Sequence, residues 1–317
     1  MRIINLIEDT AGAGGCAFAH GLSFYIETAK HRVLMDLGPG RETLENAAAL
    51  GIDLRAVDTV VLSHGHYDHS GGIMPFSEVN AQAAIYMQDG ADGEYYADDG
   101  ENEGSRVCDA EKGCKVGPAG ERAAMQNARY RYIGIDRAIM GLPQVKLLHG
   151  DCVIDEELDI FTVKKRTHAL PSTNSRLLVK NAVKTGDGQD SLSSLDDPKA
   201  LFIRDDFRHE HFLVVHEGGR SVLLSGCAHN GILSILDDYE EKYGGEPDAV
   251  ISGFHLMKKS VYTADEMAEI REIAEDLKQY RTKFFTCHCT GIPAYEEMRK
   301  IMGEQLKYVH SGEEIEL

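Results

Sequence analysis

The 317-residue sequence lacks any apolar run that approaches the roughly 20 residues needed to span a bilayer. Its first ten residues, MRIINLIEDT, have no basic region followed by an apolar stretch, so we expect a β-strand there and no secretory signal. The seven cysteines are scattered and odd in number, which favours a reducing compartment over a disulfide framework. A cytoplasmic protein is therefore expected.

Positive charge is also scarce. Lysine and arginine number 33 against 52 acidic residues, which gives a formal net charge of −19. Such a surface repels phosphate backbones and anionic lipid, so neither nucleic acid nor a membrane is an expected partner. A small anionic substrate is still compatible with this charge, because a metal centre reverses the electrostatics locally. The hydrophobic fraction of 43% is ordinary for a globular chain and is sufficient for a core.

Strand-like and helical segments occur in two blocks. The sequence contains no internal repeat of fixed period. The first block contains β-strands at 2–8, 24–27, 32–36, 57–62 and 83–87, with a helix at 41–50. The second contains a hairpin of 212–216 and 221–224, strands at 248–251 and 283–286, and helices from Thr263, capped by Glu266, and from Pro293. This order predicts a sheet-on-sheet core with outer helices.

Two regions lack such patterning. We expect one domain over 1–317, with an insertion or lid at about 88–145 and a mobile polar loop at about 181–198. The first region is rich in glycine and carries Tyr95 and Tyr96, which suit stacking on a flat ring. It is expected to cover the site or to build a subunit contact, so a homo-oligomer is compatible with the sequence.

A histidine cluster follows the buried strand 57–62. Four potential metal ligands fall within six residues: His64, His66, Asp68 and His69. Imidazole and carboxylate suit zinc, iron or manganese. His64 and His66 flank a glycine and can turn to one ion, while Asp68 and His69 can face a second. Two ions about 3.5–4 Å apart can share a water molecule. Surface loop histidines are the alternative, which the strand-end position and density of the cluster disfavour.

This His-x-His-x-Asp-His pattern resembles the signature of the metallo-β-lactamase superfamily. The resemblance implies an α/β (α+β) fold, an αββα sandwich of two mixed sheets with outer helices and the site at their edge. Asp36-Leu37-Gly38 resembles the superfamily's early Asp-x-Gly element, in which the aspartate supports the metal loop. Further segments resemble the branch that contains the archaeal 7,8-dihydropterin-6-yl-methyl-4-(β-D-ribofuranosyl)aminobenzene 5′-phosphate synthase: 20–23, 62–72, 226–232, 252–256 and 288–291.

The resemblance also completes the expected ligand set. His229 is implied as the third ligand of the His64/His66 metal, and His288 as the last ligand of the Asp68/His69 metal. Cys227 stands where the superfamily usually presents a bridging aspartate, and it is interpreted as a core thiol or as a ligand. We expect it not to be essential for metal retention, because His229 supplies that strand end. Cys287 and Cys289 should point away from the site if the segment around His288 is extended.

Other polar residues are expected at the rim of this site. His255 ends a strand and is a candidate for substrate contact or for a general acid, with packing as the alternative. Lys258 and Lys259 are candidates for holding a phosphate, although solvated surface lysines are common. Three further residues are expected to contact substrate: Asn230, Thr290 and His20. The remaining conspicuous histidines and cysteines are expected on the surface, in the hairpin or as free thiols: His168, His209, His211, His216, Cys108 and Cys114.

The expected mechanism is metal-assisted attack with two divalent transition-metal ions, of which zinc is expected and iron or manganese are alternatives. A metal lowers the pKa of bound water from about 15.7 towards about 7. Asp68 would ligate one ion and orient the nucleophile, and His255 or a water would protonate the leaving group. The branch implies a phosphorylated small molecule, either hydrolysed or transferred to an acceptor other than water.

Two other classes of protein are compatible with a metal cluster. A di-iron redox or oxygen-handling protein is disfavoured, because its relatives usually carry glutamate where this chain has His66 and include a flavin domain. A non-catalytic metal-binding sensor would be expected to have lost ligands, and none is missing here. Phosphoester or pterin-phosphate chemistry is expected to exceed lactam hydrolysis.

Overall fold

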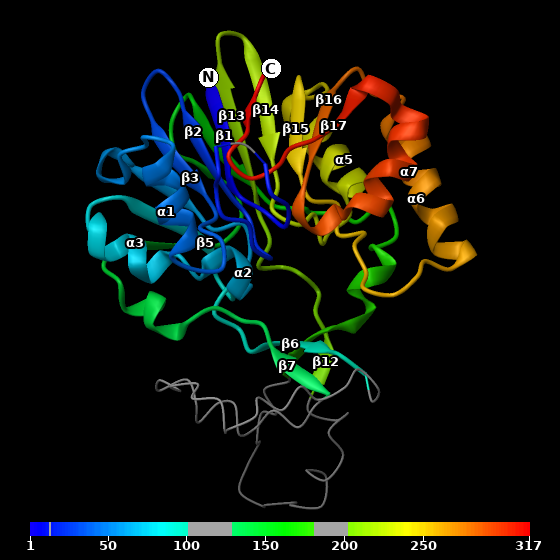
Figure 1. Cartoon of the computed structure of the whole chain (residues 1–317), viewed down its shortest axis with the longest axis horizontal. Coiled ribbons are helices and arrows are strands. Elements are labelled where there is room, and N and C mark those ends of the chain that lie inside the picture. Colours follow the sequence, from blue (N-terminus) through cyan, green and yellow to red (C-terminus); the bar gives the residue numbers. More distant parts are fainter. Residues whose placement is uncertain (13, 101–128, 181–201) are drawn as a thin grey trace, which may run out of the picture. The chain divides into compact units, whose positions relative to one another are not determined.

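A computed structural model of the protein describes residues 1–12, 14–100, 129–180 and 202–317 (Figure 1). The described chain forms two compact units. The larger comprises Met1–Asp92, Ile135–Asn174 and Phe207–Leu317, and the smaller comprises Gly93–Gly134 and Ser175–Asp206. The region expected as an insertion at 88–145 therefore contributes its central part to the smaller unit, and the loop expected at 181–198 lies outside the described residues.

The first sheet of the larger unit has seven strands in the order β18-β1-β2-β3-β4-β5-β8. Their bounds are Glu314–Ile315, Arg2–Ile7, Ser23–Glu27, Arg32–Met35, Thr59–Val61, Ala84–Gln88 and Val145–Leu148. The pairs from β18 to β3 are antiparallel, and β3, β4, β5 and β8 run parallel. The carboxyl ends of these parallel strands therefore meet at one edge of the sheet.

The second sheet also has seven strands, in the order β17-β16-β15-β14-β13-β10-β9. Their bounds are Leu306–Tyr308, Lys283–Thr286, Ala249–Ser252, Arg220–Leu224, Phe212–Glu217, Leu158–Phe161 and Cys152–Val153. Strands β14 to β17 are parallel, and the hairpin β13–β14 is antiparallel. Both sheets are mixed, as expected.

Helices cover the outer face of each sheet (Figure 1). They are α1 (Glu42–Ala49), α3 (Ile73–Val79), α5 (Ile232–Tyr243), α6 (Ala264–Leu277) and α7 (Ile292–Met302), while the short helix α2 (Tyr67–Ser70) follows β4 at the edge of the first sheet. Buried apolar residues form one cluster between the sheets, a second under α1 and α3, and a third under α5, α6 and α7. Three apolar layers between four structural layers make an αββα sandwich, which confirms the expected fold.

The local signals in the sequence agree with these elements. The capping box at the start of α6 is present, with Thr263 and Glu266 each bonded to the other's backbone. Helices α2, α3 and α5 and the short strands β8, β9, β10, β17 and β18 were not predicted. None of the described helices is long and apolar enough to cross a membrane.

The smaller unit contains one four-stranded sheet in the order β12-β11-β6-β7. Its strands are Phe202–Arg204, Leu177–Lys180, Tyr95–Asp98 and Tyr130–Tyr132, and all of the pairs are antiparallel. Tyr96 packs edge-on against Phe202 and Tyr132 in this sheet. Cys108 and Cys114 lie outside the described residues.

Candidate metal centre

The candidate ligands lie on loops that follow parallel strands of both sheets. His64 and His66 follow β4, and α2 then carries Asp68 and His69. From the second sheet, Cys227 and His229 follow β14, and His288 follows β16. Because the carboxyl ends of parallel strands meet at one edge, residues more than 200 positions apart converge there. The structure thus brings together the residues that the sequence singled out as ligands.

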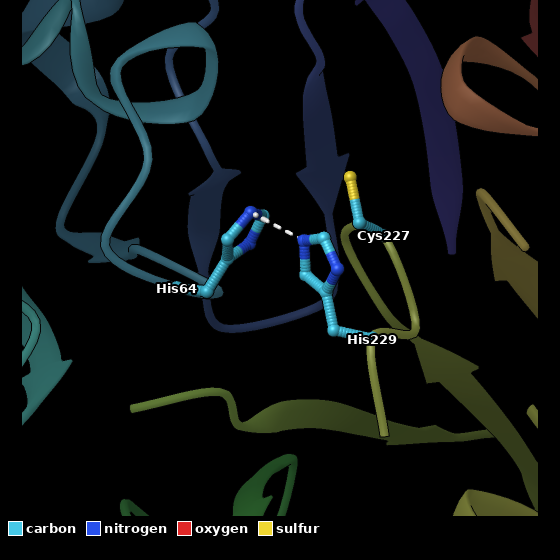
Figure 2. Close-up of side chains that lie close together, drawn as sticks. All are labelled: His64, Cys227 and His229. Carbon is cyan, nitrogen blue, oxygen red and sulfur yellow. Dashed lines mark hydrogen bonds between the residues drawn. The ribbon is translucent and has the colours of Figure 1, made fainter. Parts of the chain in front are cut away.

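The first group consists of His64, Cys227 and His229, whose ligand atoms all lie within 4.8 Å of one another. All three residues are buried. Figure 2 shows the two imidazole rings facing each other, with Nε2 of His64 3.3 Å from Nε2 of His229. The ring of His66 lies beside both, with its centroid 4.5 Å from that of His64 and 5.0 Å from that of His229.

Hydrogen bonds decide which nitrogen of these two rings carries the proton. The Ser63 hydroxyl donates to Asp36 at 2.7 Å, so its oxygen must accept from Nδ1 of His64 at 2.9 Å. The Asn174 amide donates to the His229 carbonyl at 2.7 Å, so its oxygen faces Nδ1 of His229 at 3.0 Å. Both rings therefore carry hydrogen on Nδ1 and direct an Nε2 lone pair at each other.

The contact between the two Nε2 atoms thus has no proton to share. Burial lowers the pKa of His64 and of His229 well below the ordinary value, and neighbouring histidines lower both further, so neither ring is charged near pH 7. Two lone pairs at 3.3 Å repel each other unless a cation lies near both. This arrangement fits a metal ion, and hydrogen-bonded Nδ1 atoms are the usual support of histidine ligands.

The second group consists of His69, Cys227 and His288. Nδ1 of His69 donates to Asp36 at 2.6 Å, and Nδ1 of His288 donates to Asp9. Their Nε2 atoms lie 3.8 Å and 3.6 Å from the same oxygen of Asp68. Burial alone lowers the pKa of His288, but the hydrogen bond to Asp9 and the nearby negative charges raise it to about 10. Among the described residues its buried Nε2 has no hydrogen-bond acceptor, so a metal can replace a poorly placed proton.

Cys227 belongs to both groups, and its sulfur lies 3.2 Å from Nε2 of His69. Burial raises the pKa of this thiol well above its ordinary value, and only a nearby cation would reverse that effect. The sulfur therefore belongs to both candidate ligand groups, and it would suit a shared ligand if both groups held an ion. This placement argues against the expectation that Cys227 is dispensable.

The prediction that Cys289 points away from the site is wrong. His288 has a φ of 48° and starts the 3₁₀ turn His288–Thr290, so the segment is not extended. The turn brings the sulfur of Cys289 to 3.7 Å from the carbonyl of Cys227. Alternation of side chains, which holds only in a strand, does not apply here.

Close backbone approach around Asp36 requires a glycine. A Cβ at Gly226 would lie 2.2 Å from the Ser63 hydroxyl oxygen and 3.1 Å from a carboxylate oxygen of Asp36. Asp36 itself accepts from the backbone and hydroxyl of Ser63 and from His69. One buried carboxylate thus positions a ligand of each group, directly for His69 and through Ser63 for His64, in agreement with the supporting role implied for Asp36.

His255 lies beside the first group, with its ring centroid 4.2 Å from that of His229. The Thr173 hydroxyl donates to the His255 carbonyl and accepts from Nδ1 at 2.9 Å, so Nε2 carries a lone pair. Burial and the charges of neighbouring histidines lower the pKa of His255 to about 3. A neutral ring of this tautomer accepts a proton or a hydrogen bond, which argues against the predicted general-acid role.

Several side chains that were predicted to contact substrate already bind other groups of the protein. Nζ of Lys258 lies 2.6 Å from both carboxylate oxygens of Glu266, while Lys259 is simply exposed. Buried Asn230 donates to Glu210 at 2.7 Å and accepts from Arg166 at 2.9 Å. The buried hydroxyl of Thr290 contacts Thr286 and accepts from the backbone N–H of Phe254. These pairings argue against Lys258, Asn230 and Thr290 as substrate contacts.

The structure also corrects two histidines that were expected on the surface or in the hairpin. His209 and His211 are buried. Nδ1 of His209 accepts from the backbone of Gly65 at 2.9 Å, and Nδ1 of His211 accepts from the Gln88 amide at 3.0 Å. His168 is exposed and His216 lies on β13 of the hairpin, as expected.

Two partners of the ligands carry no recognisable motif in the sequence. Asn174 lies 55 residues from His229, and Asp9 lies 279 residues from His288. The only available signal for Asp9 is its place directly after the first strand. Asn174 follows no predicted element.

Comparison with known proteins agrees with this geometry. Residues 18–105 match the family described as the metallo-beta-lactamase superfamily. The chain is 27% identical to the 7,8-dihydropterin-6-methyl-4-(beta-D-ribofuranosyl)-aminobenzene-5′-phosphate synthase of Methanocaldococcus jannaschii, over 98% of this chain and 95% of the relative. It is 23% identical to an uncharacterized protein of the same organism, over 98% of each chain.

Solved structures share the fold. A crystal structure described as a metal-dependent hydrolase of the beta-lactamase superfamily superposes with a TM-score of 0.72 at 24% identity, over 100% of this chain and 99% of the other. Zn²⁺-bound PqqB from Methylobacterium extorquens gives a TM-score of 0.52 at 12% identity, over 100% of both chains. The chain thus resembles the metallo-β-lactamase superfamily in its histidine signature, which lies within the matched residues 18–105, and in its sandwich fold. It also resembles the archaeal synthase over nearly its whole length.

Proposed function

We propose that this protein is a two-metal enzyme that acts on a phosphorylated small molecule, either by hydrolysis or by transfer to an acceptor other than water. The observation that carries the proposal is the convergence of buried Nε2 atoms whose Nδ1 atoms are all held by the protein. His64, His66 and His229 would hold one ion. Asp68, His69 and His288 would hold the other, with Cys227 between them.

The donor set favours zinc, which accepts imidazole, thiolate and carboxylate, with iron or manganese as alternatives. When bound, the two ions would lower the pKa of a water molecule and polarise a phosphoryl oxygen. The protein's own part is to fix the donors. His255, with its Nε2 lone pair, would accept a hydrogen bond from the acceptor or substrate, and Asp68 would orient the attacking group.

Cationic side chains support a phosphorylated substrate. A cavity of about 530 Å³ is lined by Lys164, Arg166 and Arg208 together with Phe207 and Asn230. Phe207 stacks on the ring of His229 with a centroid distance of 4.6 Å and an angle of 3°, so this cavity adjoins the first ligand group. Lys164 pairs with Asp151 at 2.6 Å, so Arg166 and Arg208 are the side chains proposed to hold a phosphate in this chain of net charge −19.

The relative's name supports the same substrate class, because the protein it denotes makes a ribofuranosyl 5′-phosphate compound. The test is a panel of aryl phosphodiesters, cyclic nucleotides, pterin phosphates, thioesters and lactams, assayed with the metal-loaded enzyme. We expect phosphate-containing compounds to be turned over preferentially by a wide margin. Arg166→Ala should raise KM for these compounds and leave KM for a neutral thioester unchanged. Preferred turnover of lactams or thioesters would overturn the substrate assignment.

Elemental analysis tests the metal part of the proposal separately. We expect close to two transition-metal ions per chain after reconstitution. His64→Ala should lose chiefly the first ion and Asp68→Ala chiefly the second. A stoichiometry of one ion or none in the unaltered chain would contradict the two-metal function.

A further inference from the structure

His20 lies between β1 and β2, at the open side of the second ligand group. Its side chain is 49% exposed, in contrast to the buried ligands. Its ring centroid is 5.0 Å from that of His288. Nε2 of His20 lies 3.5 Å from the Asp68 oxygen that His69 and His288 approach at 3.8 Å and 3.6 Å. Three imidazole nitrogens therefore surround one carboxylate oxygen at almost equal distances.

Carboxylates hold the far nitrogen of each of these rings. The two oxygens of Asp9 accept separately from Nδ1 of His20, at 2.8 Å, and from Nδ1 of His288. Asp36 accepts from Nδ1 of His69. Each ring thus directs Nε2 towards Asp68, which is the orientation that supporting carboxylates give to histidine ligands.

The distances between these Nε2 atoms and the Asp68 oxygen distinguish a cation site from a hydrogen-bonded cluster. A charge-assisted N–H···O bond is about 2.7–2.9 Å long, so protons on these Nε2 atoms would not be shared with Asp68 at 3.5–3.8 Å. Donor atoms bound to one zinc at about 2.0–2.1 Å lie roughly 3.3–3.5 Å apart in a tetrahedron. The spacing of His20 from Asp68 matches this value better than that of either of the other two histidines.

We infer that His20 is a further protein ligand of the second metal, beside Asp68, His69 and His288, and that Asp9 positions two of these ligands at once. The inference rests on the proposed two-metal function. Asp9 acts from the end of the first strand, where the neighbouring Glu8 also accepts from the backbone N–H of His288 at 3.0 Å. The first strand therefore supports the metal centre from a part of the chain distant from the histidine signature.

The test is metal affinity rather than turnover. In chelator competition with zinc, His20→Ala should weaken the second site at least tenfold and leave the first site unchanged. The Co²⁺-substituted protein should show an altered ligand-field spectrum, because one nitrogen donor is lost. His168→Ala is the matched control, since His168 is 41% exposed and also pairs with a carboxylate, Asp237, at 3.2 Å. That variant should leave both affinities and the spectrum unchanged.

Asp9→Asn is the second variant, and it keeps both histidines while weakening their support. It should reduce affinity at the second site with the Co²⁺ spectrum largely retained. If His20→Ala kept two ions with unaltered affinity and spectrum and only raised KM, His20 would be a substrate contact, and the inference would be overturned while the two-metal function stood. If the unaltered chain bound a single ion, both the inference about His20 and the two-metal function would be contradicted.

Discussion

At the residue scale, the chemistry of the centre depends on the partners of its histidines as much as on the histidines. Ser63, Asp36, Asn174 and Asp9 each accept from one or two Nδ1 atoms and thereby fix the tautomer. A ring without such a partner can turn and can place its proton on either nitrogen, so its lone pair is available to a metal only part of the time. The partners are therefore as testable as the ligands.

Asn174 gives the clearest test, because its side chain bonds to His229 and to no other candidate ligand. Asn174→Ala should weaken the first metal site about 10–100-fold, the usual effect of removing a partner of a ligand. Asn174→Asp keeps an oxygen acceptor for the ring and is the matched variant that should retain most of the affinity. Chelator competition measures both. Equal affinities in Asn174→Ala and the unaltered chain would show that the contact does not orient the ring.

Cys227 tests whether a thiolate replaces the bridging aspartate. Because its sulfur belongs to both ligand groups, Cys227→Ser should lower the affinity for both ions. Cys16→Ser is the control, since Cys16 is also a buried free cysteine but belongs to neither ligand group. Metal titration of both variants, monitored by the thiolate-to-Co²⁺ charge-transfer absorption, measures whether each one still binds the ions through a thiolate. Retention of both ions at normal affinity in Cys227→Ser would restore the expectation from the sequence that this cysteine is dispensable.

His31 provides a pH-dependent contact far from the ligands. Its two ring nitrogens lie 2.8 Å from Asp58 and 2.7 Å from Asp155. Burial lowers the pKa of His31, but the two carboxylates outweigh this effect and raise it above the ordinary value. A group whose pKa is raised on folding stabilises the fold below its unfolded pKa of about 6.5 and loses this contribution as pH rises through the folded pKa.

His31→Gln should therefore destabilise the protein more at pH 5.5 than at pH 9. Hydrogen bonds to charged groups contribute about 1.5–3 kcal/mol, which sets the size of the difference at low pH. Urea unfolding at the two pH values measures it. His149→Gln, at a histidine whose side chain is 76% exposed, should show no comparable difference. An equal loss of unfolding free energy at both pH values would argue that the ring acts by packing alone.

At the element scale, the loops that follow the strands are strained where they carry the site. Asp36, Ala228, His255 and His288 all have positive φ values, between 48° and 59°. These residues follow β3, β14, β15 and β16. Non-glycine residues rarely adopt this region, and strain of this kind concentrates at functional sites. The strained turns aim the ligand side chains inward.

Ala228 allows the strain to be measured, because it lies between Cys227 and His229 and is not itself a candidate ligand. A left-handed conformation costs an alanine about 1–2 kcal/mol that glycine does not lose. Ala228→Gly should therefore leave the free energy of unfolding unchanged or raise it. The control Ala274→Gly, at a buried position of α6, should lower it by roughly 1 kcal/mol or more. Equal losses in the two variants would contradict the strain argument.

The elements that the sequence predicted are those with strong local signals. The β-branched run before His64 and the capping box at Thr263 can each be recognised from a few neighbouring residues, and both are present in the structure. Short strands such as β17 and β18 gain their conformation from pairing with distant neighbours, so residues near the end of the chain do not disclose it. Helix α5 was missed because its glycine-rich start coincides with a ligand loop.

At the scale of the whole molecule, the ligands were predictable and their surroundings were not. His64, His66, Asp68 and His69 fall within six residues, so their spacing alone indicates a metal site. The partners of the remaining polar residues depend on tertiary contacts: Lys258 pairs with Glu266 at the start of α6, and Asn230 is saturated by Glu210. A sequence shows that such groups are polar, but it does not show whether the fold has already occupied them.

The two metals would also join the two sheets. His64 and His69 follow strands of the first sheet, whereas Cys227, His229 and His288 follow strands of the second. Binding that is selective for the folded state adds RT ln(1 + [L]/Kd), or about 4 kcal/mol per site when free metal is 1,000 times Kd. Each kcal/mol shifts the melting temperature of a chain of this size by about 1.5 °C, since the unfolding entropy is roughly 2.1 cal/mol/K per residue. The metal-free protein should thus melt on the order of 10 °C below the metal-loaded protein.

Metal removal should nevertheless leave the fold intact at room temperature, because the three apolar clusters of the sandwich are buried without any help from the centre. Scanning calorimetry with zinc or with chelator measures the melting temperature, and far-UV circular dichroism checks that the secondary structure persists. A His64→Ala/His288→Ala double variant, which lacks a ligand at each site, should melt at nearly the same temperature in both conditions. Loss of the far-UV signal on chelation would mean that the ions, and not the apolar layers, hold the two sheets together; equal melting temperatures for the loaded and metal-free protein would mean that no ion links them.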